Sequence, residues 1–222
     1  MLDGWPLDVA VHLGAVTGGS SEADAIGVNV AGTRTLLRYL VDRGVKRIVL
    51  ASSVAAVGCL SPGFRPRRLP VDDEHPCDAV DAYGLSKYLV EEMARYFCRL
   101  DPTLEITAFR IGSVLPPGSP EPGPDAIRNY RIPFTQLGTV TLDEVVRLLR
   151  RTVSTGPGPG FRIVNLVSPT IRSPWPTVAT LEAVLGAEAA RYDLSWYAAD
   201  GRAHAGLWAT DRLRALEASQ RD

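Results

Sequence analysis

The sequence is poor in the residues that build metal centres and disulfide frameworks. Its 222 residues include only three cysteines and three histidines. Cys59, Cys77 and Cys98 form an odd set in which no pair has the close spacing of a zinc site, so reduced thiols in a cytoplasm fit best. The scattered histidines also argue against a metal ion. We therefore predict a cytoplasmic protein with no metal.

Long apolar runs and an excess of positive charge are absent as well. No apolar stretch approaches the ~20 residues that cross a bilayer. The N-terminus does not have the basic region followed by an apolar segment that marks a secretory signal. The formal net charge is −1, which excludes a large basic footprint for nucleic acid. We expect a small-molecule ligand, and neither a membrane nor a nucleic acid as partner.

What is present is a regular alternation of apolar runs with amphipathic segments. Strands are predicted at residues 7–13, 45–51, 106–111 and 161–167, and helices at 20–44, 83–100, about 141–153 and 177–185. Residues 61–78 and 116–124 are loops rich in proline, and the tail from 187 to 222 is weakly patterned. The alternation predicts an α/β fold with a parallel sheet and crossover helices. Ligands of such sheets bind beyond the carboxyl ends of the strands.

The most specific feature is the segment Tyr83-Gly-Leu-Ser-Lys87 in the second predicted helix. Lysine is rare here, because 22 of the 24 basic residues are arginine and only Lys46 and Lys87 are lysine. Positions i and i+4 share one helix face, so the Tyr83 hydroxyl and the Lys87 ammonium point the same way. A nearby ammonium favours the tyrosinate and lowers the pKa of the tyrosine. Such a hydroxyl can exchange a proton with a carbinol near neutral pH.

Several segments occur in the order and spacing of one known family. They are Val11-His-Leu-Gly-Ala15, Asn29-Val-Ala-Gly-Thr33, Val45-Lys-Arg-Ile-Val-Leu-Ala-Ser-Ser53, Tyr83-Gly-Leu-Ser-Lys87 with Glu91, and Arg110-Ile-Gly-Ser-Val-Leu-Pro-Pro-Gly118. The sequence from about residue 7 to 186 resembles the extended short-chain dehydrogenase/reductase family, the NAD-dependent epimerase/dehydratase group. The resemblance implies a Rossmann-like sheet and NAD or NADP as cofactor.

The resemblance also implies roles for individual residues. Tyr83 is the implied acid/base, Lys87 its partner and a ligand of the nicotinamide ribose, and Ser53 the hydrogen-bond partner of the substrate oxygen. Asn29 is implied to support Lys87 through a water molecule. The implied cofactor-binding residues, besides Tyr83 and Lys87, are His12, Leu13, Gly14, Ala15, Ala51, Ser52, Arg110, Gly112, Ser113 and Val114. The implied substrate-binding residues are Ser53, Val54, Tyr83, Arg128 and Arg131.

One family landmark is missing. The family begins with a strand, a Gly-x-x-Gly-x-x-Gly turn and a helix that together hold the cofactor pyrophosphate. Here the nearest match, Gly14-Ala-Val-Thr-Gly18-Gly19, has the wrong spacing. We therefore expect a sheet that lacks the family's first two or three strands, roughly 60–70 residues by the size of such a unit. We predict an incomplete core of residues 1–115 with 139–168 and a small substrate-binding subdomain of 116–138 with 169–222.

More than one substrate class fits the sequence. The leading hypothesis is an NAD(P)-dependent oxidoreductase or epimerase that acts on a sugar or nucleotide-sugar. His12-Leu-Gly14 and Arg110-Ile-Gly-Ser113 also resemble uronate dehydrogenases, in which the arginine grips a carboxylate, and Ser53-Val-Ala-Ala-Val57 also resembles carbonyl reductases. A catalytically inactive remnant, or a binding module without cofactor, is the non-enzymatic alternative. The resemblance further suggests a homodimer through the helices near 20–43 and 83–100.

Overall fold

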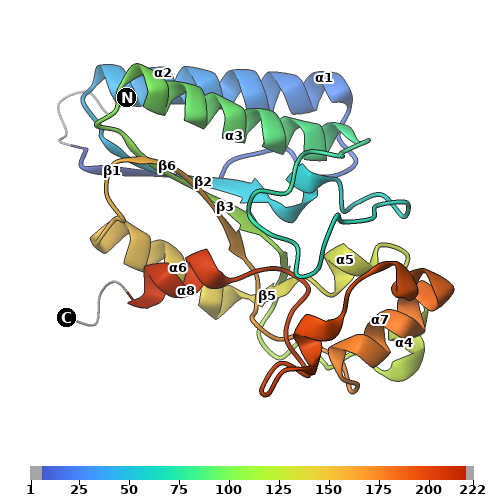
Figure 1. Ribbon diagram of the computed structural model, residues 1–222. Helices are drawn as coiled ribbons and strands as arrows, with labels where there is room; N and C mark the ends of the chain where they lie inside the picture. Colours follow the sequence, from blue (N-terminus) through green and yellow to red (C-terminus); the bar gives the residue numbers. More distant parts are fainter. Residues whose placement is uncertain (1–6, 219–222) are drawn as a thin grey trace.

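The computed structural model describes residues 7–218 of the chain, and Figure 1 shows their arrangement. Four parallel strands form the main sheet in the order β1-β2-β3-β6. They span Val9–His12, Arg47–Ser53, Glu105–Ile111 and Gly160–Leu166. The predicted α/β class and the Rossmann-like parallel sheet with flanking helices are confirmed.

Helices connect and cover these strands because parallel neighbours need long crossovers. The longer helices after β2 are α3 (Ala82–Leu100), α6 (Leu142–Ser154), α7 (Thr177–Leu185) and α8 (Asp211–Ala218). In Figure 1, α2 (Thr33–Asp42) and α3 lie over one face of the sheet, while α6 and α8 lie against the other. The helix predicted near 141–153 begins with the expected capping box, in which Thr141 and Glu144 bond each other's backbone N–H.

The connection between β1 and β2 is helical as predicted, but not uniformly so. It consists of α1 (Glu22–Asp24), the π-helical segment η1 (Ala25–Gly32) and α2 (Thr33–Asp42). Ser21 caps its start, and the chain turns away at Gly44, whose φ of 80° favours glycine. The helix predicted over residues 20–44 is confirmed, and its middle is π-helical.

Two apolar clusters join the sheet to its helix layers. Between the sheet and α2 and α3 lies a cluster that includes Leu37, Ile48 and Phe97. On the opposite face, Phe109 packs with Leu148 of α6 and other side chains of that layer. The two clusters lie on opposite faces of the sheet because successive side chains of a strand point to opposite faces.

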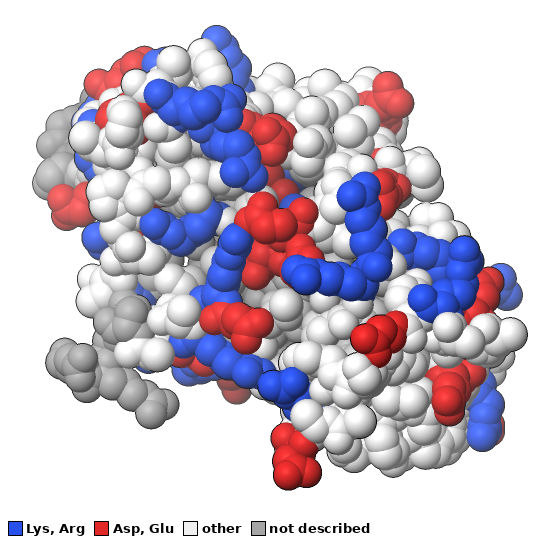
Figure 2. All heavy atoms as spheres, in the orientation of Figure 1, with Lys and Arg blue, Asp and Glu red and all other residues white. Residues whose placement is uncertain are grey.

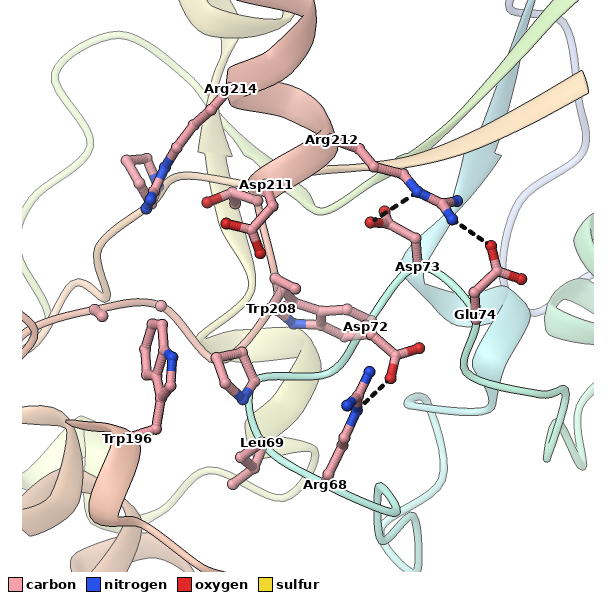
Figure 3. A pocket seen from close by; sticks show the side chains of 16 residues that line it. Arg68, Leu69, Asp72, Asp73, Glu74, Trp196, Trp208, Asp211, Arg212 and Arg214 are labelled. Atoms are coloured by element: carbon pink, nitrogen blue, oxygen red, sulfur yellow. Dashed lines mark hydrogen bonds and ion pairs between the residues drawn. The ribbon is translucent and has the colours of Figure 1, made fainter.

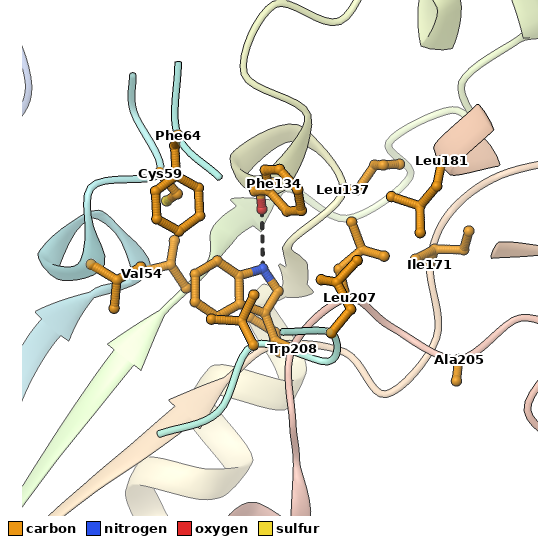
Figure 4. Close-up of a cluster of buried hydrophobic side chains, with 14 of the residues drawn as sticks. Val54, Cys59, Phe64, Phe134, Leu137, Ile171, Leu181, Ala205, Leu207 and Trp208 are labelled. Atoms are coloured by element: carbon orange, nitrogen blue, oxygen red, sulfur yellow. Dashed lines mark hydrogen bonds between the residues drawn. The ribbon is translucent and has the colours of Figure 1, made fainter. Parts of the chain in front are cut away.

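A third apolar cluster, shown in Figure 4, lies outside the sheet layers and joins segments far apart in the sequence. Its members include Val54, Phe64 and Phe134, and the Trp208 indole N–H donates to the Phe134 carbonyl at 3.0 Å. The short elements around it are η2 (Val54–Val57), β4 (Ser113–Leu115), α4 (Pro124–Arg128), α5 (Pro133–Gln136), β5 (Thr139–Thr141), η3 (Gly186–Arg191) and η4 (Ser195–Ala198).

The tail that looks weakly patterned in the sequence is built into this part of the molecule. Val71 donates its N–H to the Leu207 carbonyl, and the Ala209 N–H donates to the Val71 carbonyl, both at 2.8 Å. The tail then continues into α8 against the sheet. Residues 1–6 and 219–222 of the two predicted domains lie outside the described residues.

Candidate active site

The predicted catalytic residues meet at the carboxyl end of β2. The strand ends at Ser53, and the chain turns into η2. The helix α3 begins beside this turn. The Asp81 side chain caps the start of α3 by accepting the Gly84 N–H at 2.7 Å. Gly84 allows a close approach: a Cβ at this position would lie 2.5 Å from the Ala55 carbonyl oxygen. Tyr83 is thus placed one helical turn before Lys87, next to the end of β2.

Three consecutive residues of β2 contact three side chains of α3 that are spaced one turn apart. The Ser53 hydroxyl hydrogen-bonds the Tyr83 side chain. The Lys87 ammonium donates to the Ala51 carbonyl at 2.7 Å. The Ser52 hydroxyl donates to Glu91 Oε1 at 2.6 Å. The structure therefore brings Ser53, Tyr83 and Lys87 together, and it adds Glu91, which the sequence presented only as part of the motif.

The electrostatics of the pair differ from the sequence expectation. Burial raises the pKa of Tyr83 above its usual value, the hydrogen bond from Ser53 opposes that rise, and the Asp81 carboxylate adds to it. Burial lowers the pKa of Lys87 to about 8, against the opposing effect of Glu91. The prediction that the Lys87 ammonium leaves the tyrosine with a lowered pKa is wrong for this structure, because burial raises the pKa of Tyr83.

Asn29 and His12 hold the segment that follows β1. The Asn29 side chain accepts the Val16 N–H at 2.8 Å and donates to the Val16 carbonyl and to the Ser86 hydroxyl. The His12 ring bonds the Thr33 hydroxyl at 3.0 Å. Burial, and then the Lys87 charge, lower the pKa of His12. Asn29 thus ties the loop after β1 to α3 by direct bonds, and the predicted water-mediated support of Lys87 stays a prediction.

The predicted cofactor-binding residues divide into an open group and a packed group. Leu13 is 54% exposed, and Gly14 lies beside it at the carboxyl end of β1. Gly112 is packed against the Gly138 carbonyl, and the Ser113 hydroxyl donates to the Thr135 carbonyl at 3.1 Å. Ala15 is partly buried, and Val114 is 44% exposed on β4.

Arg110 lies in a different environment from the one predicted. Its guanidinium is buried and forms a bidentate pair with Glu91, with Nε to Oε1 at 2.9 Å and Nη2 to Oε2 at 2.8 Å. Its Nη1 donates to the Asp73 carbonyl at 3.1 Å. A substrate carboxylate could reach Arg110 only by breaking this buried pair. The uronate-dehydrogenase-like role of Arg110 is therefore not available in this arrangement.

The predicted substrate-binding residues outside Ser53 and Tyr83 are not drawn into one site. Val54 is buried within the third apolar cluster. Arg128 is exposed, lies 5.0 Å from the Trp175 ring centroid and pairs with Asp125 at 3.3 Å. Arg131 is exposed as well.

A pocket of about 420 Å³ lies away from these residues and is shown in Figure 3. Its walls combine charged and apolar residues: Arg212 pairs with Asp73 at 3.8 Å and with Glu74 at 2.5 Å, and Trp196 and Trp208 supply apolar surface. Figure 2 shows acidic side chains gathered in the middle of this face with basic ones on either side. The described residues include no group of three or more histidine, cysteine or acidic side chains that could hold a metal ion. Among them no helix is long and apolar enough to cross a membrane.

Comparisons with known proteins agree with this architecture. Human UDP-glucose 4-epimerase is 30% identical over 141 residues, which are 61% of this chain and 38% of the human protein. Uronate dehydrogenase of Pseudomonas syringae pv. tomato is 32% identical over 163 residues, which are 73% of this chain and 52% of that protein. The chain thus spans less than two thirds of the length of either relative.

Solved structures show the same fold. Uronate dehydrogenase from Agrobacterium tumefaciens superposes with a TM-score of 0.58 at 27% identity, covering 76% of this chain and 55% of that one. UDP-glucose 4-epimerase from Bifidobacterium longum, in complex with NAD+ and UDP, gives 0.56 at 20% identity, covering 72% and 56%. The model of the NAD dependent epimerase/dehydratase family matches residues 2–133, more than half of the chain. The chain therefore belongs to the NAD dependent epimerase/dehydratase family.

Proposed function

We propose that the protein is an NAD(P)-dependent oxidoreductase or epimerase that acts on a sugar or nucleotide-sugar. The observation that carries the proposal is the meeting of Ser53, Tyr83 and Lys87 at the carboxyl end of β2, where parallel sheets bind ligands. The relatives support the substrate class, since one is a UDP-glucose 4-epimerase and another a uronate dehydrogenase.

In this proposal each of the three residues has one task. Ser53 holds the substrate oxygen in place. Tyr83 takes the proton when a carbinol is oxidised and returns it when a carbonyl is reduced. Lys87 holds the nicotinamide ribose through its N–H donors. Bound NAD(P) supplies the chemistry of hydride transfer.

The described residues fit the nicotinamide half of such a cofactor. The Lys87 ammonium has three N–H donors, and within residues 7–218 its hydrogen-bond acceptor is the Ala51 carbonyl. His12 and the open stretch from Leu13 to Ala15 lie at the carboxyl end of the adjacent strand β1. In this proposal these residues bind the ribose and the nicotinamide. The backbone of Ser52 and of the turn from Arg110 to Val114 lies around the bound group.

The division of labour along the chain is part of the same proposal. We assign cofactor binding to the core of residues 1–115 with 139–168 and substrate binding to residues 116–138 with 169–222, except that α8 packs against the sheet of the core. Arg128 and Arg131 lie in the second unit and are exposed, so they are the residues we assign to a substrate phosphate or carboxylate. Cys59, Cys77 and Cys98 are free thiols, which supports a cytoplasmic location.

A uronate is the second candidate substrate. The Pseudomonas uronate dehydrogenase matches a larger share of this chain than the human epimerase does, 73% against 61%. Because Glu91 occupies the Arg110 guanidinium, the carboxylate of a uronate would be held by Arg128 or Arg131 instead.

The decisive test combines cofactor binding with one substitution. Thermal unfolding is followed with NAD+, NADH and NADPH, and turnover is measured on UDP-glucose, galacturonate and an aryl aldehyde. A cofactor at a hundred times its dissociation constant adds about 2.7 kcal/mol to the free energy of unfolding. Tyr83→Phe should reduce turnover by about 10²–10⁴-fold while cofactor binding is kept. Tyr96→Phe, on the exposed side of the same helix, is the matched control.

Two outcomes would contradict the proposal. Full activity of Tyr83→Phe would exclude the tyrosine as the acid/base. A folded protein that shows neither a cofactor-dependent shift nor turnover would support the alternative of a binding module without cofactor.

We also propose a homodimer that uses the helices from Glu22 to Asp42 and from Ala82 to Leu100. These helices carry large apolar side chains that are exposed, namely Val28, Tyr39, Leu85, Tyr96 and Leu100. The two helices lie next to each other on one side of the molecule (Figure 1). A second copy could bury this surface through a twofold interface.

A further inference from the structure

Glu91 and Arg110 form a fully buried ion pair directly behind the proposed site. The side chains are 1% and 2% exposed. Both carboxylate oxygens of Glu91 accept from Arg110, and Oε1 also accepts the Ser52 hydroxyl. Burying two charges is costly unless they are paired and hydrogen-bonded. This pair meets both conditions, so its geometry is fixed by the fold.

The pair is connected to the site on two sides. Ser52, which Glu91 holds, lies between Ala51 and Ser53, and these neighbours contact Lys87 and Tyr83. Along α3, Glu91 follows Lys87 by one turn on the same face. Glu91 therefore constrains both the strand end and the helix that together position the lysine.

The charges that face Lys87 come from several elements. His12 on β1 interacts with its charge, and the Tyr83 ring centroid lies 5.7 Å from its ammonium. Asp81 acts on Tyr83 rather than on the lysine. Against burial, Glu91 is the group that favours the charged form of Lys87.

We propose that Glu91, held by Arg110 and Ser52, is a positioning residue that keeps the Lys87 ammonium and the end of β2 in their working arrangement. It does not touch the reacting atoms, since it lies two turns beyond Tyr83 on α3 and its oxygens are occupied. This inference rests on the proposed function for its meaning. Its test, however, does not need an active enzyme.

The small number of lysines makes the test direct. With lysine labelled by ¹³C and ¹⁵N during expression, the protein gives Cε signals from Lys46 and Lys87 alone. The variant Lys46→Arg removes the Lys46 signal and so assigns both signals. Lys46 lies at the surface with Asp101 and provides an internal reference. A titration between about pH 6 and 11 then reports the pKa of Lys87, expected near 8 in the parent.

Glu91→Gln should move the Lys87 midpoint lower by about one pH unit, because the opposite charge that favours the ammonium is lost. Arg110 is left unpaired in this variant, which can prevent folding. The double variant Glu91→Gln with Arg110→Gln removes both charges and should lower the midpoint by less, since the repelling guanidinium is absent too. Glu92→Gln, a partly exposed neighbour on the same helix, should leave it unchanged.

An unchanged Lys87 midpoint in the folded double variant and in folded Glu91→Gln would overturn the inference. Turnover adds a second readout in which the high-pH limit of activity should fall together with the Lys87 midpoint. If the parent binds no cofactor and turns over no substrate, the proposed function fails while the lysine titration still decides the role of Glu91.

Discussion

At the scale of single residues, Asp73 is a carboxyl group whose surroundings favour its neutral form. It is 6% exposed, and its Oδ1 accepts the Asn165 N–H at 2.6 Å. Burial raises its pKa from 3.8 to about 6, although Asn165, Arg212 and Arg110 all oppose the rise. The charge of Asp73 is therefore a cost to the folded state at neutral pH.

The sign of the pH dependence follows from proton linkage. Because the pKa of Asp73 is higher in the folded state, the folded state binds more protons between about pH 4 and 6. The contribution of Asp73 to stability is complete below about pH 4 and is lost as the pH rises through 6. A difference of about two pKa units corresponds to roughly 3 kcal/mol.

Asp73→Asn should thus stabilise the protein at pH 8 by about 1–3 kcal/mol, because asparagine is neutral and keeps the Oδ1 acceptor for Asn165. Near pH 4 the variant and the parent should be equally stable. Urea unfolding at the two pH values measures the difference, with Asp125→Asn, 96% exposed, as the control. A lower urea midpoint for Asp73→Asn than for the parent at pH 8 would contradict this prediction. It would show that the Asp73 carboxylate stabilises the folded state through Arg212 or Arg110.

The residues of the site divide into those that spacing can predict and those that it cannot. Tyr83 and Lys87 share a helix face because of the four-residue spacing, and that much is readable in the sequence. Arg110 is not readable in the same way, since its partner Glu91 belongs to another element and the pairing depends on how α3 crosses the sheet. The raised pKa of Tyr83 depends on burial, which a local motif does not contain.

At the scale of elements, the contact between α3 and η2 depends on a glycine. A Cβ on Gly84 would lie 2.5 Å from the Ala55 carbonyl oxygen and 3.0 Å from Asp81 Oδ2. The first atom is backbone and cannot rotate away. Any larger side chain must therefore move the start of α3 away from the end of β2, where Ser53 contacts Tyr83.

Gly84→Ala should destabilise the protein by about 1–3 kcal/mol, the usual cost of overpacking, and should lower turnover further by separating Ser53 from Tyr83. Gly27→Ala is the matched control in η1, since a Cβ there meets no atom within 4 Å and alanine favours helix. Thermal unfolding and turnover of both variants provide the measurement. Equal stability of Gly84→Ala and the parent would mean that α3 and η2 can move apart without a loss of stability.

The elements also differ in how far the sequence predicts them. The capping box of α6 was predictable because Thr141 and Glu144 form it within four residues. The π-helical segment Ala25–Gly32 was not, because its apolar spacing also fits a regular α-helix. Asn29 lies in this segment and binds Val16 and Ser86. These bonds join the segment to the loop after β1 and to α3, and partners so far apart in the sequence cannot be read from the local pattern.

At the scale of the whole molecule, the order of the parallel sheet follows from the alternation of strands and helices, while the position of the tail does not. Val71 lies between Leu207 and Ala209 through two backbone hydrogen bonds. Trp208 between them packs under Phe134. These contacts join residues 74 or more positions apart, and backbone pairing of that kind leaves no periodic signal in the tail.

The predicted homodimer is a property of the whole molecule, and it can be tested without an assay of activity. Tyr96 is 47% exposed on α3 and Tyr39 is 37% exposed on α2. If these helices form the interface, Tyr96→Glu places an unpaired charge in it and should weaken dimerisation by tenfold or more, about 1.4 kcal/mol or greater. Sedimentation velocity over a dilution series measures the dissociation constant.

The control must be equally apolar and equally exposed, but on the other side of the sheet. Val146 on α6 is 44% exposed, so Val146→Glu should leave the dimer intact. If Val146→Glu weakens the dimer and Tyr96→Glu does not, the interface lies on the α6 side of the sheet. A parent that sediments as a monomer at every concentration would mean that exposed Tyr39, Tyr96 and their neighbours do not serve self-association, and the apolar helix faces would need another explanation.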